Sequence, residues 1–317
     1  MQRKEKIELE TIAFEDYVLS NERPYLTVGM FDGVHCGHRS LLQELVGKAH
    51  SHNAKAVVVS FTSHPRQVLN ATDGGFALLQ DCTHRQNEIA SCGVDCLLWI
   101  DFTAELASME ASEFLDMLIA KVNPCQVLVG YDNRFGRKGS REFEDIIAEE
   151  RYKDVVVKRS ETKVLCEGVE VSSTQIRKAL GDGNVSLAAK MLSKPYSLSG
   201  IVESGRQIGR RIGFPTANVR VESGFLLPKD GVYAVKVSIE GRVFGGVLNL
   251  GHKPTIDKQE RTIEVHVFDF SEQIYDKSIE IAFIEYLRSQ QRFESLDDLK
   301  AQIEKDCEDA KLKIGLL

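Results

Sequence analysis

The first half of the chain alternates short apolar runs with amphipathic stretches. Apolar runs typical of buried strands cover residues 24–29, 54–61, 93–100, 125–130 and 154–158. Apolar side chains at helical spacing predict helices over residues 40–49, 81–91 and 112–121. Continuous apolar strands separated by helices indicate a parallel sheet joined by right-handed crossovers. We therefore expect ligands to bind beyond the carboxyl ends of these strands.

After about residue 185 the pattern changes to short segments in which apolar and polar residues alternate. Such alternation covers residues 231–239, 243–250 and 262–270, and Glu240-Gly241 fits a hairpin turn between the first two. Closely spaced short strands of this kind predict a small antiparallel barrel.

The tail reads as one helix from about Ser295, a plausible N-cap, to Leu312. Its expected apolar stripe is Leu296, Leu299, Ile303 and Cys307. We place a linker around residues 181–195 and predict two domains, residues 1–184 and 185–317.

Composition narrows the functional classes. The chain has 317 residues, 43% of them hydrophobic and 27% charged, and its formal net charge is −7. This balance gives no electrostatic case for nucleic-acid binding. The charged start is unlike a secretory signal, and no apolar run is long enough to span a membrane. Seven cysteines, an odd number without a CxxC pair, favour reduced thiols in a cytoplasmic protein. The oligomeric state stays open.

The turn between the first strand and the first helix carries two histidines in an HxGH pattern. His35 and His38 flank Gly37, and the turn begins with Gly29 and Phe31. A helix N-terminus offers free N–H groups and the positive end of a dipole, both of which suit phosphate. Two imidazoles there can stabilise charge on a reacting phosphate. A hydrogen-bonded turn and part of a metal site are the alternative interpretations.

Two further segments of the first half carry polar groups suited to a nucleotide. A polar, basic turn containing Asp132 follows the buried strand 125–130, and a solvated loop is its plain alternative. Three hydroxyl residues then open a predicted helix, with an arginine one turn along. Hydroxyls at a helix start are usually N-caps, but together with a guanidinium they can also hold a triphosphate. These residues are Ser172, Ser173, Thr174 and Arg177.

The second half contains a glycine-rich loop. Gly205, Gly209 and Gly213 interleave with arginines, and Thr216 and Asn218 follow directly. Such a loop offers N–H groups and positive charge to phosphates, and the hydroxyl and amide oxygens suit Mg²⁺. It is not a P-loop because the Gly-Lys-Ser/Thr ending is missing. A glycine-rich turn of the barrel is the alternative.

The alternating segment 262–270 places a carboxylate among apolar residues. Glu264, His266 and Phe268 are expected to share one face of this strand. A carboxylate there can take the proton from an attacking hydroxyl, although an exposed glutamate is also unremarkable.

In order and spacing, these motifs resemble prokaryotic bifunctional riboflavin kinases/FAD synthetases. The HxGH turn is similar to that of nucleotidylyltransferases, and His64-Pro65, the Asp132 turn and the Ser-Ser-Thr-x-Ile-Arg helix follow as in the FAD synthetase half. The chain departs from the family pattern at Thr62, Ser63 and Asn133, which bear on the flavin pocket. The resemblance implies a Rossmann-like α/β nucleotidylyltransferase domain followed by a riboflavin kinase barrel with a C-terminal helix.

The resemblance also implies roles. In the first domain His35 and His38 would activate ATP phosphates, with Asp132 as a polar active-site residue and Arg177 among the triphosphate ligands. In the barrel Glu264 would be the base on the riboflavin 5′-hydroxyl. The remaining ATP-binding residues would be Gly29, Phe31, Ser172, Ser173, Thr174, Gly205, Gly209, Gly213 and Thr216. Thr216 and Asn218 would also bind Mg²⁺, and Asn249 and Arg288 would contact the flavin.

The expected activity is therefore phosphorylation of riboflavin to FMN, then adenylylation of FMN to FAD with release of pyrophosphate. ATP and Mg²⁺ would serve both steps. Two alternatives remain: an adenylyltransferase for another acceptor whose barrel only binds flavin, and a flavin-binding regulatory module without chemistry. Intact Thr216, Asn218 and Glu264 argue against the first, and intact His35 and His38 against the second.

Overall fold

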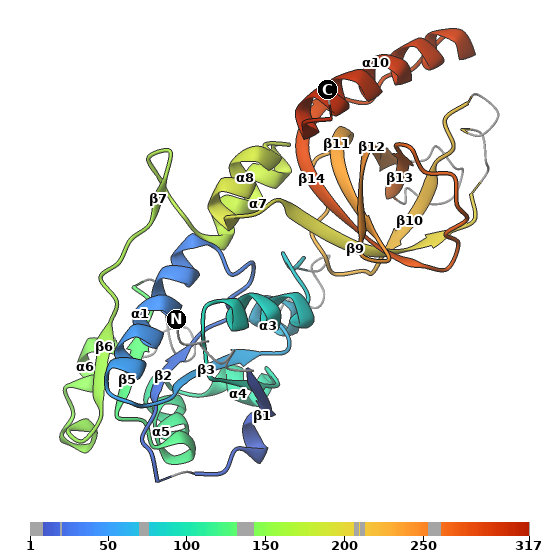
Figure 1. Ribbon diagram of the computed structural model, residues 1–317. Coiled ribbons are helices and arrows are strands. Elements are labelled where there is room, and N and C mark those ends of the chain that lie inside the picture. The colour runs from blue at the N-terminus through green and yellow to red at the C-terminus, as the bar shows by residue number, and fades with distance from the viewer. Residues whose placement is uncertain are drawn as a thin grey trace, which may run out of the picture. The chain divides into compact units, whose positions relative to one another are not determined.

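A computed structural model describes the chain as two compact units, residues 1–171 and 172–317 (Figure 1). The residues that the structure describes are 9–19, 21–69, 76–131, 143–205, 209, 213–252 and 261–316. The domain boundary expected between residues 184 and 185 stays a prediction. The segment predicted as a linker is largely helical, because apolar residues at helical spacing form α8 (Val185–Leu192).

The first unit is built on a six-stranded sheet in which every described pairing is parallel. Its order is β1-β4-β3-β2-β5-β6, which confirms the predicted α/β architecture. The strands are β1 (Glu10–Ala13), β2 (Tyr25–Val28), β3 (Ala56–Phe61), β4 (Cys96–Ile100), β5 (Gln126–Val129) and β6 (Val156–Arg159). The edge strand β1 was not predicted, because its sequence lacks the apolar run of the inner strands.

Helices cover both faces of this sheet. Alternate residues of β3 face opposite ways: Val57 and Val59 pack against α5, while Ala56 and Val58 pack against α1 and α3. This double burial explains why the inner strands read as continuous apolar runs. The helices are α1 (Cys36–Ser51), α2 (Pro65–Leu69), α3 (Cys82–Ser91), α4 (Ala104–Ser108), α5 (Ala111–Val122) and α6 (Phe143–Ile147), with 3₁₀ turns at Phe14–Asp16 and Glu150–Tyr152 and a hairpin of β7 (Leu165–Cys166) and β8 (Val169–Glu170).

The second unit begins with α7 (Ser173–Gly181) and α8 and continues as a closed antiparallel barrel. The predicted hairpin turn is confirmed: Glu240 and Gly241 both have positive φ, as a two-residue turn of this type requires. The barrel order is β10-β13-β12-β11-β14-β9, with β9 (Tyr196–Glu203), β10 (Ala217–Val221), β11 (Gly231–Ile239), β12 (Arg242–His252), β13 (Arg261–Val267) and β14 (Ser278–Arg288).

The terminal helix α10 (Leu296–Ile314) begins at the predicted N-cap, where Ser295 Oγ accepts from the Asp298 N–H at 3.1 Å. The predicted stripe is wrong at its start, since Leu296 lies in the first turn and is 64% exposed. The helix instead packs through Ile303, Cys307, Ala310 and Ile314 against Val232, Ala234, Val247 and Phe268 of the barrel unit.

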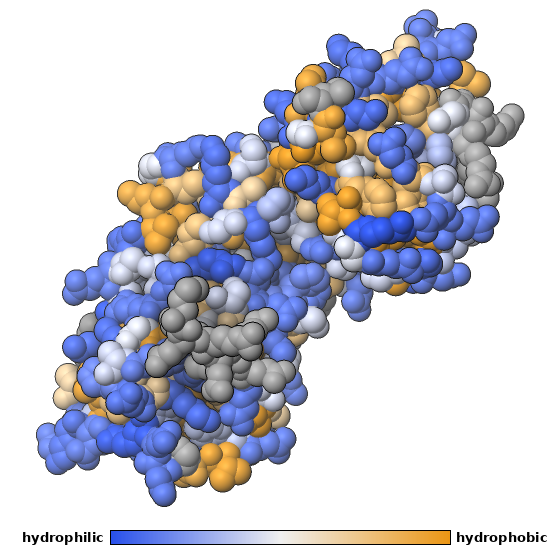
Figure 2. All heavy atoms as spheres, in the orientation of Figure 1, coloured by the Kyte–Doolittle hydropathy of each residue, from blue (hydrophilic) through white to orange (hydrophobic). Residues whose placement is uncertain are grey.

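The surface drawn in Figure 2 is mostly hydrophilic, with scattered apolar groups. No disulfide joins any of the seven cysteines, and their reduced state stays a prediction. In the part of the chain that the structure describes, no helix combines the length and apolarity needed to cross a membrane.

A buried ion pair fastens α10 to the end of β14. Arg288 donates from Nε and Nη2 to the two carboxylate oxygens of Asp306, at 2.8 and 2.6 Å, and Gln302 also donates to Asp306. Asp306→Ala leaves the guanidinium without its carboxylate, and removing one partner of such a pair costs about 3 kcal/mol of unfolding free energy. Calorimetry of the full chain should show the barrel transition at lower temperature. Fluorescence of the single tryptophan, Trp99 of β4, should show an unchanged first unit.

Asp309→Ala, at an exposed position of the same helix, is the matched control and should leave both transitions in place. An Asp306→Ala variant as stable as the parent would mean that the ion pair contributes nothing to docking of the helix.

Candidate active sites

The HxGH turn connects the central strand β2 to α1 through a strained backbone. Phe31 and Val34 have φ of 50° and 35°, and both side chains are fully buried. Positive φ is unfavourable for bulky residues, above all for a β-branched valine. Packing of these two side chains therefore holds the backbone in a conformation that the sequence alone disfavours.

His35 and His38 lie together at the start of α1. The ring centroids are 3.6 Å apart and nearly parallel, and His35 Nδ1 accepts the backbone N–H of His38 at 3.2 Å, which makes His35 the N-cap. A Cβ on Gly37 would lie 3.2 Å from the His35 ring, so glycine leaves room for this stacking. Likewise Gly29 lies against the ring of Phe31. The structure thus brings four predicted residues of the ATP site into one turn.

The stacked pair affects protonation. Burial lowers the pKa of His38 well below its usual value, and the neighbouring His35 and the Arg85 cation lower it further. The Phe31 and His38 rings form a T-shaped contact, with their centres 5.2 Å apart. His38 is therefore neutral at pH 7, and it can still donate one N–H to a phosphate oxygen.

Sequence reasoning missed two residues that hold neighbouring segments at this edge of the sheet. The buried Asp32 accepts the backbone N–H of Leu79 at 3.0 Å, which ties the segment before α3 to the HxGH turn.

Arg159, at the end of β6, donates to the carbonyls of Gly130 and Tyr131 at 3.1 and 3.0 Å. Asp132, the next residue along, lies outside the described residues, as does Asn133. Thr62, one of the departures from the family pattern, forms a local hydrogen bond: its hydroxyl donates to the Asp101 carboxylate at 2.6 Å.

The hydroxyl cluster begins α7 in the second unit. Ser172 is the N-cap, and its Oγ accepts the backbone N–H of Gln175 at 3.3 Å. Ser173 and Thr174 occupy the first turn, and Arg177 folds back to donate to the Ser173 carbonyl at 3.1 Å. Capping thus accounts for Ser172, and phosphate binding by this group stays a prediction.

At each of the three loop glycines, the local structure disfavours a residue with a side chain. A Cβ on Gly205 would meet the Asn218 amide at 2.0 Å, and one on Gly209 would meet the Phe214 carbonyl at 2.2 Å. Gly213 has a φ of +94°, which favours glycine. Gly209 also accepts the Phe214 N–H at 2.8 Å. Gly205 and Gly209 therefore lie close against residues 214–218.

Register places three predicted site residues in one row across the barrel. Asn218 of β10 pairs with Glu264 of β13, which pairs in turn with Asn249 of β12. Directly opposed residues project to the same face, with Cβ atoms about 5 Å apart. Ile263 and Val265, on either side of Glu264, are buried in the barrel, so the row lies on its outer face.

Aromatic packing supports the prediction that Glu264, His266 and Phe268 share one face. His266 follows Glu264 on the outer face, and its Nδ1 donates to the Pro215 carbonyl at 2.8 Å, directly before Thr216. β13 ends at Val267, but the Phe268 N–H still donates to the Gly245 carbonyl at 2.8 Å, and the centres of the Phe268 and His266 rings are 5.9 Å apart. Phe268 therefore stays on the outer face, where α10 covers it.

The two predicted flavin ligands, Asn249 and Arg288, each form side-chain hydrogen bonds within the second unit. Asn249 accepts from Gln290 Nε2 at 3.1 Å, and the Gln290 side chain fills the space over Gly251. Gln290 was missed by sequence reasoning because nothing in its local pattern marks it. Arg288 is engaged with Asp306, so its flavin contact stays a prediction.

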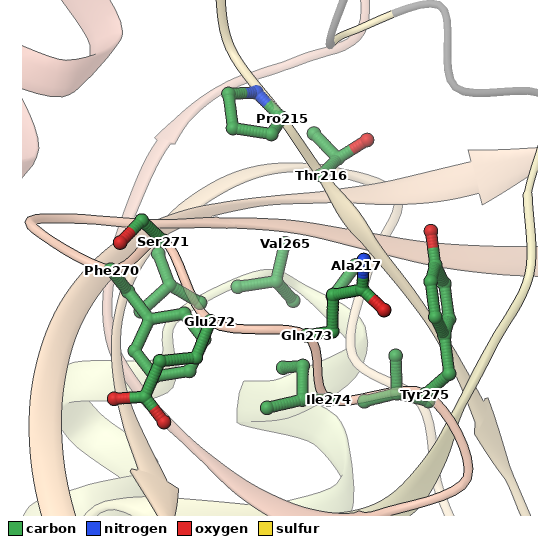
Figure 3. A pocket seen from close by; sticks show the side chains of 12 residues that line it. Pro215, Thr216, Ala217, Val265, Phe270, Ser271, Glu272, Gln273, Ile274 and Tyr275 are labelled. Carbon is green, nitrogen blue, oxygen red and sulfur yellow. The ribbon is translucent and has the colours of Figure 1, made fainter.

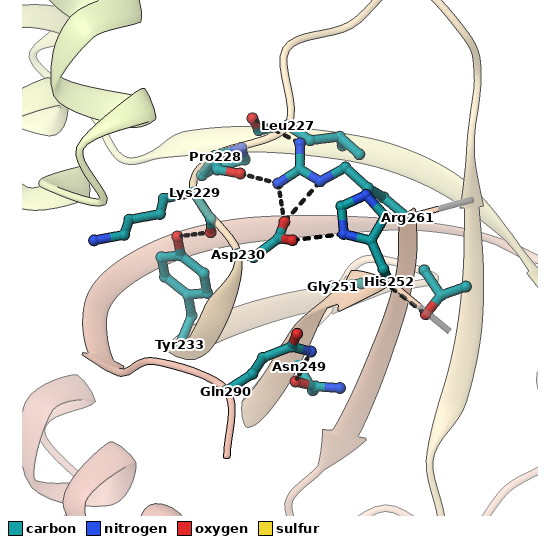
Figure 4. Close-up of polar contacts among 11 residues, drawn as sticks. Leu227, Pro228, Lys229, Asp230, Tyr233, Asn249, Gly251, His252, Arg261 and Gln290 are labelled. Carbon is teal, nitrogen blue, oxygen red and sulfur yellow. Dashed lines mark hydrogen bonds and ion pairs between the residues drawn. The ribbon is translucent and has the colours of Figure 1, made fainter. Parts of the chain in front are cut away.

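A polar network closes the barrel end near Asn249 (Figure 4). Arg261 donates to Asp230 at 2.7 Å and to the carbonyls of Leu227 and Pro228, and Asp230 also binds His252 Nδ1 at 2.9 Å. These contacts tie the ends of β12 and β13 to the start of β11.

A pocket of about 300 Å³ opens beside Thr216 (Figure 3). Figure 3 shows Pro215 and Thr216 on one side and the loop of residues 270–275 on the other. Val202, Val265, Val267 and Ile274 supply apolar walls, and Thr216, Gln273 and Tyr275 supply polar groups. Mostly apolar walls with a few polar groups are typical of small-molecule sites.

Comparison with known proteins decides the family. A FAD synthetase family model matches residues 18–175, and a riboflavin kinase (flavokinase) model matches residues 192–314. The bifunctional riboflavin kinase/FMN adenylyltransferase of Escherichia coli (strain K12) is 37% identical over 294 residues, covering 92% of this chain and 93% of the relative. The chain belongs to the bifunctional riboflavin kinase/FMN adenylyltransferase family. The Bacillus subtilis (strain 168) relative is 33% identical over 90% of each chain.

The fold of this family member also matches a solved structure. A protein from Streptococcus pneumoniae, described as a macrolide-efflux protein, aligns with a TM-score of 0.86 at 30% identity. The alignment covers 96% of this chain and 98% of that one, so the two share one fold along nearly their whole lengths.

The lowered pKa of His38 predicts a pH-dependent stability of the first unit. The unfolded chain binds a proton to this histidine below about pH 6.5, and the folded unit does not. Neutral His38 therefore makes its full contribution to the free energy of unfolding above the pKa of the unfolded chain. This contribution is lost as pH falls toward the pKa of His38 in the folded unit. Between these two values stability should drop by at most about 1.4 kcal/mol per pH unit.

Urea unfolding followed by Trp99 fluorescence at pH 7.5 and 5.5 measures this drop. His38→Ala should reduce it, whereas His52→Ala, at an exposed position of the same unit, should not. Equal pH dependence in parent and His38→Ala would show that His38 titrates normally.

Proposed function

We propose that this chain converts riboflavin to FMN in its barrel and FMN to FAD in its α/β unit, with ATP as the donor in both reactions. One observation carries the proposal beyond family membership. The oxygen donor Asn218, the carboxylate Glu264 and the amide Asn249 stand in one row on the outer face of the barrel. Thr216, just before β10, borders the pocket that Val265 and Val267 of β13 also line.

In the kinase reaction the riboflavin 5′-hydroxyl attacks the γ-phosphorus of ATP. Glu264 takes the hydroxyl proton, the new P–O bond forms, and ADP leaves with the electron pair of the broken bond. The pocket beside Thr216 accepts the adenine end of ATP, which directs the phosphates toward Thr216 and Asn218. Asn249 orients the flavin next to the base.

Mg²⁺ fits the residues present. The Thr216 hydroxyl and the Asn218 amide offer hard oxygen ligands, and Mg²⁺ commonly takes one or two protein ligands together with substrate phosphates. Packing of the Asn218 amide against Gly205 holds one donor in place. When bound, the ion shields the phosphate charge during transfer.

In the adenylyltransferase reaction a phosphate oxygen of FMN attacks the α-phosphorus of ATP, and pyrophosphate leaves. His35 and His38 donate hydrogen bonds to the oxygens on which charge grows, and the N-terminus of α1 adds its dipole. Gly29 and Phe31 shape the turn around the phosphates. Asp132 is a further proposed ATP-binding residue of this unit. In the second unit, the proposed triphosphate ligands are Ser172, Ser173, Thr174 and Arg177, and Arg288 is a proposed flavin ligand. Free thiols are consistent with the proposed cytoplasmic location.

Glu264→Gln should abolish FMN formation and spare FAD formation from supplied FMN. The variant keeps the shape of the side chain but cannot take the proton, a loss worth about 10²–10⁴-fold in rate. Chromatography of flavins after incubation with riboflavin and Mg-ATP measures it. Glu222→Gln, at an exposed position after β10, is the matched control and should behave as the parent. Normal phosphorylation by Glu264→Gln would rule out Glu264 as the base.

His38→Ala should give the opposite flavin profile, in which FMN accumulates with little FAD. Loss of one donor to a developing phosphate charge is worth roughly 10²–10³-fold in rate. The same chromatographic assay reads both activities in one sample, so continued FMN formation shows that the barrel is intact. FAD forming at the parental rate would make this histidine a purely structural residue.

A further inference from the structure

Arg85 is a buried cation beside the HxGH turn that no motif singled out. It lies on α3 and is 1% exposed. Nη1 donates to the Met30 carbonyl at 2.7 Å, Nη2 contacts the Cys82 sulfur at 3.1 Å, and the guanidinium carbon lies 4.8 Å from the centre of the Trp99 ring. Nε is buried without a hydrogen-bond partner. The charge is thus enclosed mainly by neutral groups.

Among the described residues, no carboxylate forms an ion pair with Arg85. Other arginines of the same unit, Arg39 and Arg151, do pair with carboxylates. An arginine cannot escape burial by losing its proton, and a buried charge without a counter-ion is strongly unfavourable. The arrangement therefore calls for an anion that the described chain does not supply.

The position of Arg85 indicates what that anion is. Met30, whose carbonyl it holds, lies in the turn between β2 and α1, and its charge is close enough to affect His38. Nδ1 of His38 is also buried without a partner. Two unpartnered buried nitrogens therefore lie at the end of the sheet where parallel α/β folds bind ligands.

We propose that Arg85 is a phosphate-binding residue of the adenylyltransferase site, and that phosphate oxygens of ATP or of FMN are its missing counter-ion. This inference rests on the proposed FAD synthesis. In that reaction a bond forms between an FMN phosphate oxygen and the α-phosphorus, and the bond to the β-phosphate breaks. Its electron pair leaves with pyrophosphate, and the Arg85 charge stabilises the anion on whichever side it binds.

Trp99 makes the binding directly measurable, because it is the only tryptophan and lies against the Arg85 guanidinium. Its fluorescence in the full chain is titrated with inorganic pyrophosphate. The unaltered chain should show a saturable change, and Arg85→Lys, which keeps the charge, should stay within a few-fold of it. Arg85→Met, which keeps the apolar stem over Trp99, should need at least about tenfold more pyrophosphate. Arg23→Gln, an exposed arginine bonded to backbone carbonyls, is the matched control and should titrate as the parent.

Steady-state FAD synthesis from supplied FMN identifies the source of the phosphate. A raised KM for ATP in Arg85→Met assigns the residue to the triphosphate, and a raised KM for FMN assigns it to the flavin phosphate. Riboflavin phosphorylation should be unchanged in every variant. Unchanged pyrophosphate titration together with unchanged FAD kinetics in Arg85→Met would overturn the inference. No FAD from the unaltered chain would instead contradict the proposed function.

The unaltered chain supplies a test that does not depend on folding of a variant. Pyrophosphate should raise the thermal midpoint of the Trp99 transition, and Arg85→Gln, a second neutral variant, should show a smaller rise. Absence of any rise in the unaltered chain would overturn the inference even if Arg85→Met does not fold.

Discussion

The register between three neighbouring barrel strands is the constraint on which the kinase site depends. β10, β13 and β12 pair so that Asn218, Glu264 and Asn249 stand opposite one another. Side chains alternate between the two faces of a strand, so a slip of one residue would turn Glu264 into the barrel interior. The apolar residues on either side of Glu264 prevent that slip, because it would expose Ile263 and Val265 to water. Burial of Ile263 and Val265 in the barrel core thus keeps the Glu264 carboxylate on the outer face.

In the α/β unit, apolar packing likewise holds the strained turn after β2 in place. Phe31 and Val34 adopt positive φ, and their burial in the core provides the stabilisation that offsets this strain. The strained turn stacks His35 on His38 at the start of α1, where the helix dipole already favours an anion. Burial then keeps His38 neutral. In both units, apolar packing determines where the polar groups are placed.

Much of this arrangement follows from sequence pattern. Apolar runs located the inner strands, alternation located the barrel, and Glu240-Gly241 located its hairpin, because each pattern reflects burial or turn geometry directly. The edge strand β1 was missed because its four residues, Glu10–Ala13, lack the apolar run of the inner strands. Helix α8 was mistaken for linker because glycines and a proline flank a short apolar stretch.

The site was predictable only as far as its motifs extend. His35, His38, Asn218 and Glu264 lie in recognisable patterns, and the structure gathers them within their own units. Arg85 and Gln290 act through contacts between segments far apart in the chain, which no local pattern records. Arg288 was predicted to bind flavin, but its partner Asp306 lies on a helix whose docking the sequence does not specify.

The central claim is that the row of Asn218, Glu264 and Asn249 is where riboflavin is phosphorylated. A crystal structure of the full chain with riboflavin and ADP tests it most directly. We expect the riboflavin 5′-hydroxyl oxygen within about 3.2 Å of a Glu264 carboxylate oxygen, with ADP in the pocket beside Thr216. Riboflavin bound away from this row, or ADP outside that pocket, would contradict it.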